Sequence, residues 1–485
     1  MVKLLIGLAL AASANAFAAP TKEVMNDYLV KFTPGVLQNM QLFSGLAAKG
    51  AQIEPLIDTW IRIQAPANKI SKEQFEALAT DPSIEYVQPN YTIRLLEDFR
   101  IQDPLRRAAY TMTLKRNPEM AAAAPRQDNP AIPDAPAQKN GTDPDLNKQW
   151  GMKDIGAAEG WKVTRGNPEM IVAVLDTGVD YTHEDLLPNM WRNPREIPNN
   201  GVDDDNNGYV DDIVGWDFVA NDNKPYDLAV SWQELLVGGG NPGHGTHCAG
   251  NVAARGGNSL GISGVAPNVK IMALRFISEK GAGTTADAIK AIRYAIDNGA
   301  KITSNSWGSE GEDPSEGAEN KALRDVIQYS QDHGSLFIAA AGNGHSGVGY
   351  DNDTDKNPGV PASYNHDIIV SVAALDVRDQ LGSFSNWGLK TVDIGAPGVD
   401  VYSTTVGNKY NNKVIDVGGL EVTWDGTSMA TPHVAGAAAL YWSAHPEKSW
   451  QDVKAAILGS AKKINSLNNK AVSGGKLDVK ALMSY

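Results

Sequence analysis

The feature that most constrains the fold is a series of short apolar runs, separated by helical or loop stretches, from Asp143 to the C-terminus. Runs this short, without polar alternation, are typical of parallel strands buried on both faces. Between two of them, residues 284–298 carry isoleucines at helical spacing, and Gly299 is a typical helix stop. The pattern predicts an α/β fold, a mostly parallel twisted sheet with helices on both faces. The runs are residues 171–175, 269–274, 335–340 and 368–372.

The N-terminal part has a different organisation. Residues 19–96 alternate strand-like and helical stretches, which predicts a small α+β domain. Residues 97–141 are rich in proline and alanine and lack a pattern, which indicates an exposed linker. The predicted α/β domain then covers residues 142–485. The stretches of the small domain are strands at 28–32, 59–63 and 84–87 and helices near 38–48 and 71–80.

The first 18 residues have the anatomy of a secretory signal. Lys3 precedes an apolar run over residues 4–12, and small-x-small sites follow at residues 14–18. The run is too short to span a bilayer, and no later run reaches the roughly 18 apolar residues that a membrane helix needs. We therefore expect an exported protein without a membrane span, in the periplasm or outside the cell.

The net charge and the cysteine content exclude one class of partner and one source of stability. The formal net charge is −14, which argues against a nucleic-acid partner because phosphate binding needs a basic surface. Cys248 is the one cysteine, so no intramolecular disulfide can form. A core or a metal ion must stabilise the fold, and we expect a monomer.

Reactive side chains concentrate in three segments. Asp176 ends the run at 171–175, His244 opens a run of small residues, and Ser428 precedes another. Serine is a weak nucleophile that needs an adjacent base, itself oriented by a carboxylate. Each residue alone also fits a plainer role as a turn aspartate, part of a metal-binding pair or a helix cap. Pro432 predicts that the helix begins close to it, with Ser428 near its positive end.

Together, and in this order, the three segments resemble the signature motifs of the subtilisin-like serine proteases, the subtilases, over about Asp143 to Tyr485. The resemblance implies that Asp176 orients the imidazole, His244 acts as general base and then acid, and Ser428 is the nucleophile. The run AAAGNG resembles the family's oxyanion segment, which implies that Asn343 donates to the oxyanion.

The same resemblance implies a substrate cleft. Residues 277–284 resemble the edge strand that pairs with substrate backbone, a mode that accepts many protein and peptide sequences. Ser306, Trp307 and Gly308 resemble a wall of the primary pocket, with tryptophan in place of the usual leucine. Cys248 is expected to be a buried thiol and not a nucleophile. The expected substrate-binding residues are Gly281, Ala282, Gly283, Ser306, Trp307 and Gly308.

Two segments predict calcium. An acidic loop places oxygen ligands at alternate positions around Gly208, as Ca²⁺ prefers, although an acidic solvated turn is the alternative. The resemblance implies a second calcium site, formed by two side chains and two backbone carbonyls. Asp145 is a further candidate ligand. The loop ligands are Asp203, Asp205, Asn207 and Asp211, and the second set is Asp185, Asn258, Leu260 and Ile262.

Residues 84–91 resemble the end of the subtilase propeptide, which implies that residues 19–96 assist folding and inhibit the enzyme. Carrying the register forward places residues 93–96 in the cleft and the first autocleavage after Leu96. The sequence thus predicts a secreted, calcium-stabilised serine endopeptidase, made with its own inhibitor. The alternatives are a catalytically silent binding protein on the same fold and a secreted esterase, which the order of the reactive residues disfavours.

Overall fold

The computed structural model describes residues 25–33, 43–57, 59–97, 99–100, 107, 111–112, 130–134, 140–309, 320–417 and 420–485. The predicted signal segment and most of the predicted linker lie outside these ranges. The chain divides into two compact units, Met1–Asn90 and Tyr91–Tyr485. The division falls six residues before the predicted end of the propeptide, and residues 91–96 belong to the second unit.

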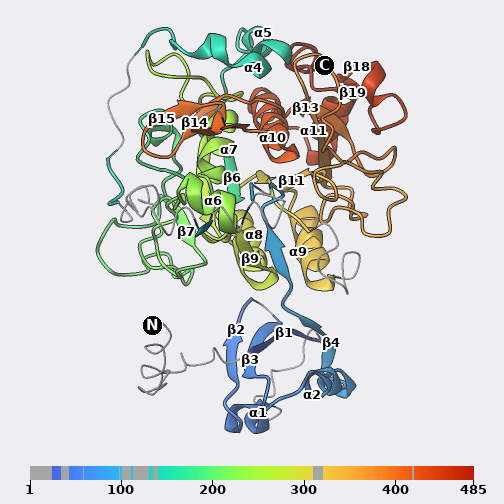
Figure 1. The fold of residues 1–485 in the computed structure, drawn as a ribbon. Helices are drawn as coiled ribbons and strands as arrows, with labels where there is room; N and C mark the ends of the chain where they lie inside the picture. The colour runs from blue at the N-terminus through green and yellow to red at the C-terminus, as the bar shows by residue number, and fades with distance from the viewer. Residues whose placement is uncertain are drawn as a thin grey trace, which may run out of the picture. The chain divides into compact units, whose positions relative to one another are not determined.

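The N-terminal unit contains a four-stranded antiparallel sheet in the order β2-β3-β1-β4 (Figure 1). Three successive residues of β1, Tyr28 to Val30, are buried, and Tyr28 stacks on Phe75 of α2 at 4.4 Å between ring centroids. Among the described residues, β2 was not anticipated from sequence. The elements are β1 (Met25–Phe32), α1 (Ser44–Ala48), β2 (Gln52–Pro55), β3 (Trp60–Pro66), α2 (Lys72–Glu76), a 3₁₀ turn (Ala77–Thr80) and β4 (Ile84–Pro89).

The second unit is built on a nine-stranded sheet in the order β18-β19-β13-β12-β11-β10-β6-β8-β7. Its pairs are parallel except for β18 with β19, which confirms the predicted α/β fold. Both β10 and β13 were missed because their runs are only four residues long. The strands are β6 (Ile171–Asp176), β7 (Gly215–Asp217), β8 (Lys270–Arg275), β10 (Ile302–Asn305), β11 (Leu336–Ala340), β12 (Ile369–Leu375), β13 (Ile394–Pro397), β18 (Lys462–Lys463) and β19 (Gly475–Lys476).

Helices cover both faces of this sheet. Helices α7 (His244–Ala253) and α10 (Thr427–Ala444) pack together on one side, and α8 (Thr285–Asp297) and α9 (Lys321–Asp332) on the other (Figure 1). Small side chains let α7 and α10 approach closely, and every residue of α7 is buried. Among the described residues, no helix is long and apolar enough to cross a membrane. Shorter helices are α4 (Trp150–Asp154), α5 (Ala157–Gly160), α6 (Trp232–Gly238), α11 (Trp450–Gly459) and α12 (Val479–Leu482).

Candidate active site

Strand ends and helix starts bring the predicted reactive side chains to one edge of the sheet. Asp176 is the last residue of β6, and Asn343 follows β11 by three residues. His244 is the first residue of α7, and Ser428 is the second of α10. Because the carboxyl ends of parallel strands lie at the same edge, side chains far apart in the sequence meet there.

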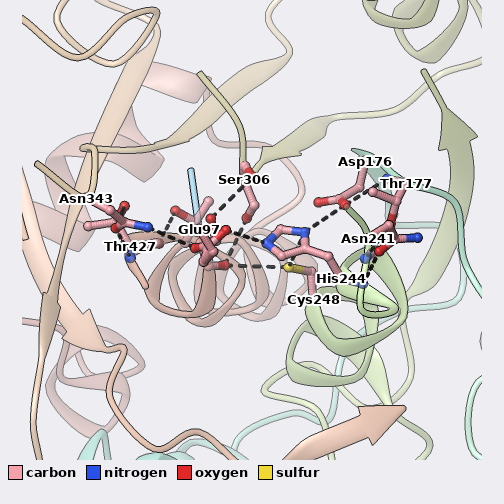
Figure 2. A network of polar contacts seen from close by, with 12 residues as sticks. Glu97, Asp176, Thr177, Asn241, His244, Cys248, Ser306, Asn343 and Thr427 are labelled. Carbon is pink, nitrogen blue, oxygen red and sulfur yellow. Dashed lines mark hydrogen bonds and ion pairs between the residues drawn. The ribbon is translucent and has the colours of Figure 1, made fainter. Parts of the chain in front are cut away.

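Asp176 and His244 form a buried pair. The Nδ1 atom of His244 lies 2.8 Å from Oδ1 of Asp176, and neither residue is exposed to solvent (Figure 2). Burial is the largest single effect on the pKa of His244 and lowers it, but the Asp176 carboxylate, Cys248 and Glu97 together act more strongly in the opposite direction, so the pKa lies well above its usual value. The carboxylate therefore orients the imidazole and stabilises its protonated form.

The hydroxyl of Ser428 does not bond to this imidazole. It donates instead to the carbonyl oxygen of Ser306 at 3.3 Å. The Nε2 atom of His244 has no hydrogen-bond partner among the described residues and faces Oε2 of Glu97 at 3.2 Å. The side chains of His244 and Ser428 are thus not joined by a hydrogen bond, and the side chain of Glu97 lies against the imidazole.

That side chain, Glu97, also reaches Asn343. Its Oε1 accepts a hydrogen bond from Nδ2 of Asn343 at 3.0 Å, and the Glu97 side chain is only 4% exposed. The amide of Asn343 is fixed in this orientation because its Oδ1 accepts from the N–H and hydroxyl of Thr427, at 2.9 and 2.8 Å. The Glu97 carboxylate oxygen therefore occupies the position to which the fixed Asn343 amide donates. Sequence reasoning did not anticipate this residue.

Residues 92–96 run between the two segments that were expected to bind substrate. Strand β5 (Thr92–Arg94) pairs antiparallel with β9 (Ala282–Thr284), and the N–H of Leu95 donates to the carbonyl of Gly281 at 3.1 Å. On the other side, Arg94 and Gly308 exchange two backbone hydrogen bonds of 3.0 Å. The chain thus completes a small sheet, as an extended substrate does in β-augmentation.

The side chain of Trp307 differs from expectation. It is fully buried, with its ring edge-on to Phe276 at 5.1 Å and to Phe337 at 6.2 Å between centroids. The ring packs against these two rings, and the side chain of Leu96 is the one that approaches Gly308.

Pro432 lies deeper in α10 than predicted. The helix begins at Thr427, so Pro432 is its sixth residue and lies beyond the first turn. Proline has no N–H, so the carbonyl of Ser428 lacks its usual helical donor. That carbonyl accepts instead from the hydroxyl of Ser306 at 2.9 Å and from the thiol of Cys248 at 3.5 Å. The buried thiol of Cys248 thus has a structural partner, and burial raises its pKa.

The four residues of the second expected calcium set lie close together. Asp185 is fully buried and accepts from Nδ2 of Asn258 at 2.7 Å and from the N–H of Ile262 at 2.9 Å. The N–H of Leu260 donates to Oδ1 of Asn258 at 2.9 Å. Burial raises the pKa of Asp185 to about 6, so a cation beside it would relieve an unfavourable charge. The contacts within this set are hydrogen bonds from N–H groups to the oxygens of Asp185 and Asn258, and Asp145 is paired with Lys148 at 2.9 Å.

The acidic loop brings together two of the predicted residues and one that was not predicted. Carboxylate oxygens of Asp203, Asp205 and Glu196 lie within 4.8 Å of one another. Asp211 instead accepts from the backbone of residues 200–201, at 3.0 and 2.9 Å, and Asn207 donates to Asp212 at 2.9 Å. Both therefore hold the loop in shape. Glu196 was missed because it precedes the motif by seven residues and reaches it only through the turn.

Comparisons with known proteins indicate the family of this chain. Residues 167–474 match the model of the subtilase family. The chain is 37% identical over 317 residues to the thermophilic serine proteinase of Bacillus sp. (strain AK1), covering 65% of this chain and 62% of the relative. It is 35% identical over 319 residues to thermitase of Thermoactinomyces vulgaris, covering 66% and 90%. Subtilisin-like protease 1 of Plasmodium falciparum is 30% identical over 348 residues, covering 69% and 46%. The matched region thus spans less than two thirds of the first and third relatives.

Proposed function

The chain belongs to the subtilase family of serine-type endopeptidases, and on this premise we propose that it hydrolyses peptide bonds with Asp176, His244 and Ser428 as its catalytic triad. Ser428 attacks the scissile carbonyl while His244 takes its proton and later returns it to the leaving amine. Asp176 holds the imidazole at 2.8 Å and stabilises the imidazolium. The amide of Asn343 and the N–H of Ser428 receive the negative charge that develops on the carbonyl oxygen.

The observation that carries this proposal is the double contact of the Glu97 carboxylate. One oxygen lies 3.0 Å from Nδ2 of Asn343, and the other lies 3.2 Å from Nε2 of His244. An anionic group therefore finds an oxyanion donor and a general base within hydrogen-bond reach at the same point. A transition state that combines an oxyanion with a proton in transfer requires the same pair of groups.

The proposed substrate is an unfolded or extended segment of protein. Residues 92–96 make the contacts that such a segment would make, with backbone hydrogen bonds to Gly281 and Gly308. In this register Leu96 is the last residue before the cut, so the Leu96–Glu97 bond is the proposed site of the first, intramolecular cleavage. The segment before Glu97 then acts as a product-like inhibitor until it is released.

Calcium is proposed to stabilise the mature domain. The residues that would hold it are Asp185 with Asn258 and neighbouring carbonyls, and the cluster of Asp203, Asp205 and Glu196. When bound, the ion supplies only electrostatic cross-linking of these loops. Residues 1–18 are proposed to direct export.

Active-site labelling tests the assignment. A fluorophosphonate probe should label the matured wild-type chain on Ser428 and leave Ser428→Ala unlabelled, and only wild type should degrade casein. A correctly folded wild type that takes no label and leaves casein intact would identify a silent binding protein. Labelling with hydrolysis of lipid esters, but not of casein, would identify an esterase.

A further inference from the structure

A second buried carboxylate lies behind the catalytic pair, and the reaction does not use it. Asp227 lies between β7 and α6 and is completely buried. Its Oδ1 accepts from the hydroxyl of Thr177 at 2.9 Å and from Nδ2 of Asn241 at 2.6 Å. Its Oδ2 accepts from both the N–H and the hydroxyl of Thr246, at 2.8 and 2.6 Å. One carboxylate thus ties together three segments of the chain.

These segments carry the catalytic residues. Thr177 follows Asp176 directly, and Asn241 and Thr246 lie on either side of His244 in the sequence. Figure 2 shows Thr177 and Asn241 grouped on the far side of the Asp176–His244 pair from Glu97. Asp227 touches neither catalytic side chain, so any role it has is to position them.

The network completes the start of α7. The first four N–H groups of a helix have no partner within the helix, and the residue before α7, Gly243, has no side chain to cap them. Asn241 Oδ1 accepts from the N–H groups of Gly243 and His244, at 2.8 and 2.9 Å. The hydroxyl of Thr177 accepts from Gly245 at 2.9 Å. Since Asp227 itself takes the N–H of Thr246, it caps the helix directly and orients both other acceptors.

We propose that Asp227 is a positioning residue for the catalytic base: it acts as a remote cap that fixes the first turn of α7, and with it His244, against the end of β6. This inference rests on the proposed function. The negative charge of Asp227 at the helix N-terminus also favours the protonated form of His244.

The charged environment defines the expected pH effect. Asp227 faces Asp176 and Tyr226, while Asp176, Cys248 and Glu97 face His244. Burial raises the pKa of Asp227 to about 6, so it is ionised at neutral and alkaline pH. Removing that charge should lower the pKa of His244, because one anion that favours imidazolium is lost. The acid limb of the activity profile should then move to lower pH.

The test compares Asp227→Asn with wild type, each matured from the full chain and counted by fluorophosphonate titration. Loss of general-base alignment should lower kcat per active site about tenfold or more, with KM changed less than about threefold. The control is Asp393→Asn. That carboxylate is also buried and accepts from the Ser371 N–H at 2.8 Å, but it precedes β13, four strands from β6.

Thr177→Val keeps the test decisive if Asp227→Asn does not fold. This variant removes the hydroxyl that links Asp227 to Gly245 and leaves the charge of Asp227 in place. We therefore expect kcat to fall without a shift of the acid limb. Thr177→Ser, which keeps the hydroxyl, should restore kcat. Either of two results would overturn this inference and leave the proposed function standing. One is an Asp227→Asn variant with wild-type kcat and an unshifted acid limb. The other is a Thr177→Val variant with wild-type kcat. A wild type without any proteolytic activity would overturn the proposed function and this inference with it.

Discussion

At the scale of single residues, the group that faces Nε2 of His244 determines what the site can do. In the uncleaved chain this group is the Glu97 carboxylate, which lies 3.2 Å from Nε2 and helps to raise the pKa of the imidazole. A protonated His244 cannot accept the proton of Ser428. The side chain of the residue that becomes the new N-terminus, and not only the scissile bond, therefore sets when the imidazole becomes available as a base.

Replacing Glu97 should change the titration of His244. In a Ser428→Ala background, which keeps the chain uncleaved, Glu97→Gln removes a negative charge while retaining the shape of the side chain. We expect the pKa of His244 to be lower in this double variant, because an anion that favours imidazolium has been lost. Nuclear magnetic resonance of labelled histidine measures it, and an equal or higher pKa would contradict the contact.

The resemblance to the subtilase motifs predicted Asp176, His244, Ser428 and Asn343, and in the structure each of them lies close to the end of a strand or the start of a helix. Asp227 could not be found in this way, since it lies 50 residues from Thr177 in sequence and no periodic pattern surrounds it. The role of Glu97 could not be predicted from the sequence either, because it depends on the path of the chain through the cleft.

At the scale of elements, strand β9 and the segment at Gly308 form the two walls that hold an extended chain. Short apolar runs and Gly299 predicted β6, β8, β11, β12 and α8 to within about three residues, because burial on both faces leaves a clear signal. The two-to-four-residue strands left no such signal, since their pairing depends on neighbours distant in sequence. Pro432 was misplaced because side chains from other elements satisfy the carbonyl it leaves free.

The pairing of β9 with substrate predicts the effect of Gly281→Ala. Gly281 has a φ of +73°, and its carbonyl accepts from Leu95. A side chain there is strained by about 1 kcal/mol and should turn the carbonyl away from the substrate. KM for extended peptides should rise severalfold, while turnover of a single-residue ester should not change.

Gly299→Ala is the matched control. Gly299 has a similar φ of +86°, open space around its Cα, and a place at the end of α8. Both variants should lose comparable stability, but only Gly281→Ala should affect KM. Equal KM values in the two variants would show that this carbonyl does not hold substrate.

At the scale of the whole molecule, stability without a disulfide depends on the core and, in our proposal, on calcium bound to the folded state. Asp185 is the most deeply buried of the proposed ligands, and binding to the native state alone stabilises it by about 2.7 kcal/mol at one hundred times Kd. Calcium should therefore raise Tm in wild type, and chelation should reverse the increase. In Asp185→Asn most of this increase should vanish, whereas Asp393→Asn should retain it. If calcium still raises the Tm of Asp185→Asn by as much as that of wild type, the proposed calcium site at Asp185 is wrong.

The central claim is that this chain cuts itself between Leu96 and Glu97 with Ser428. The most direct measurement follows full-length wild type and Ser428→Ala by mass spectrometry in millimolar calcium, with N-terminal sequencing of each product. The account predicts that only wild type is cleaved and that its first new N-terminus is Glu97. Cleavage of both chains would assign the cut to another protease, and an intact or differently cut wild type would contradict the register of residues 92–96 in the cleft.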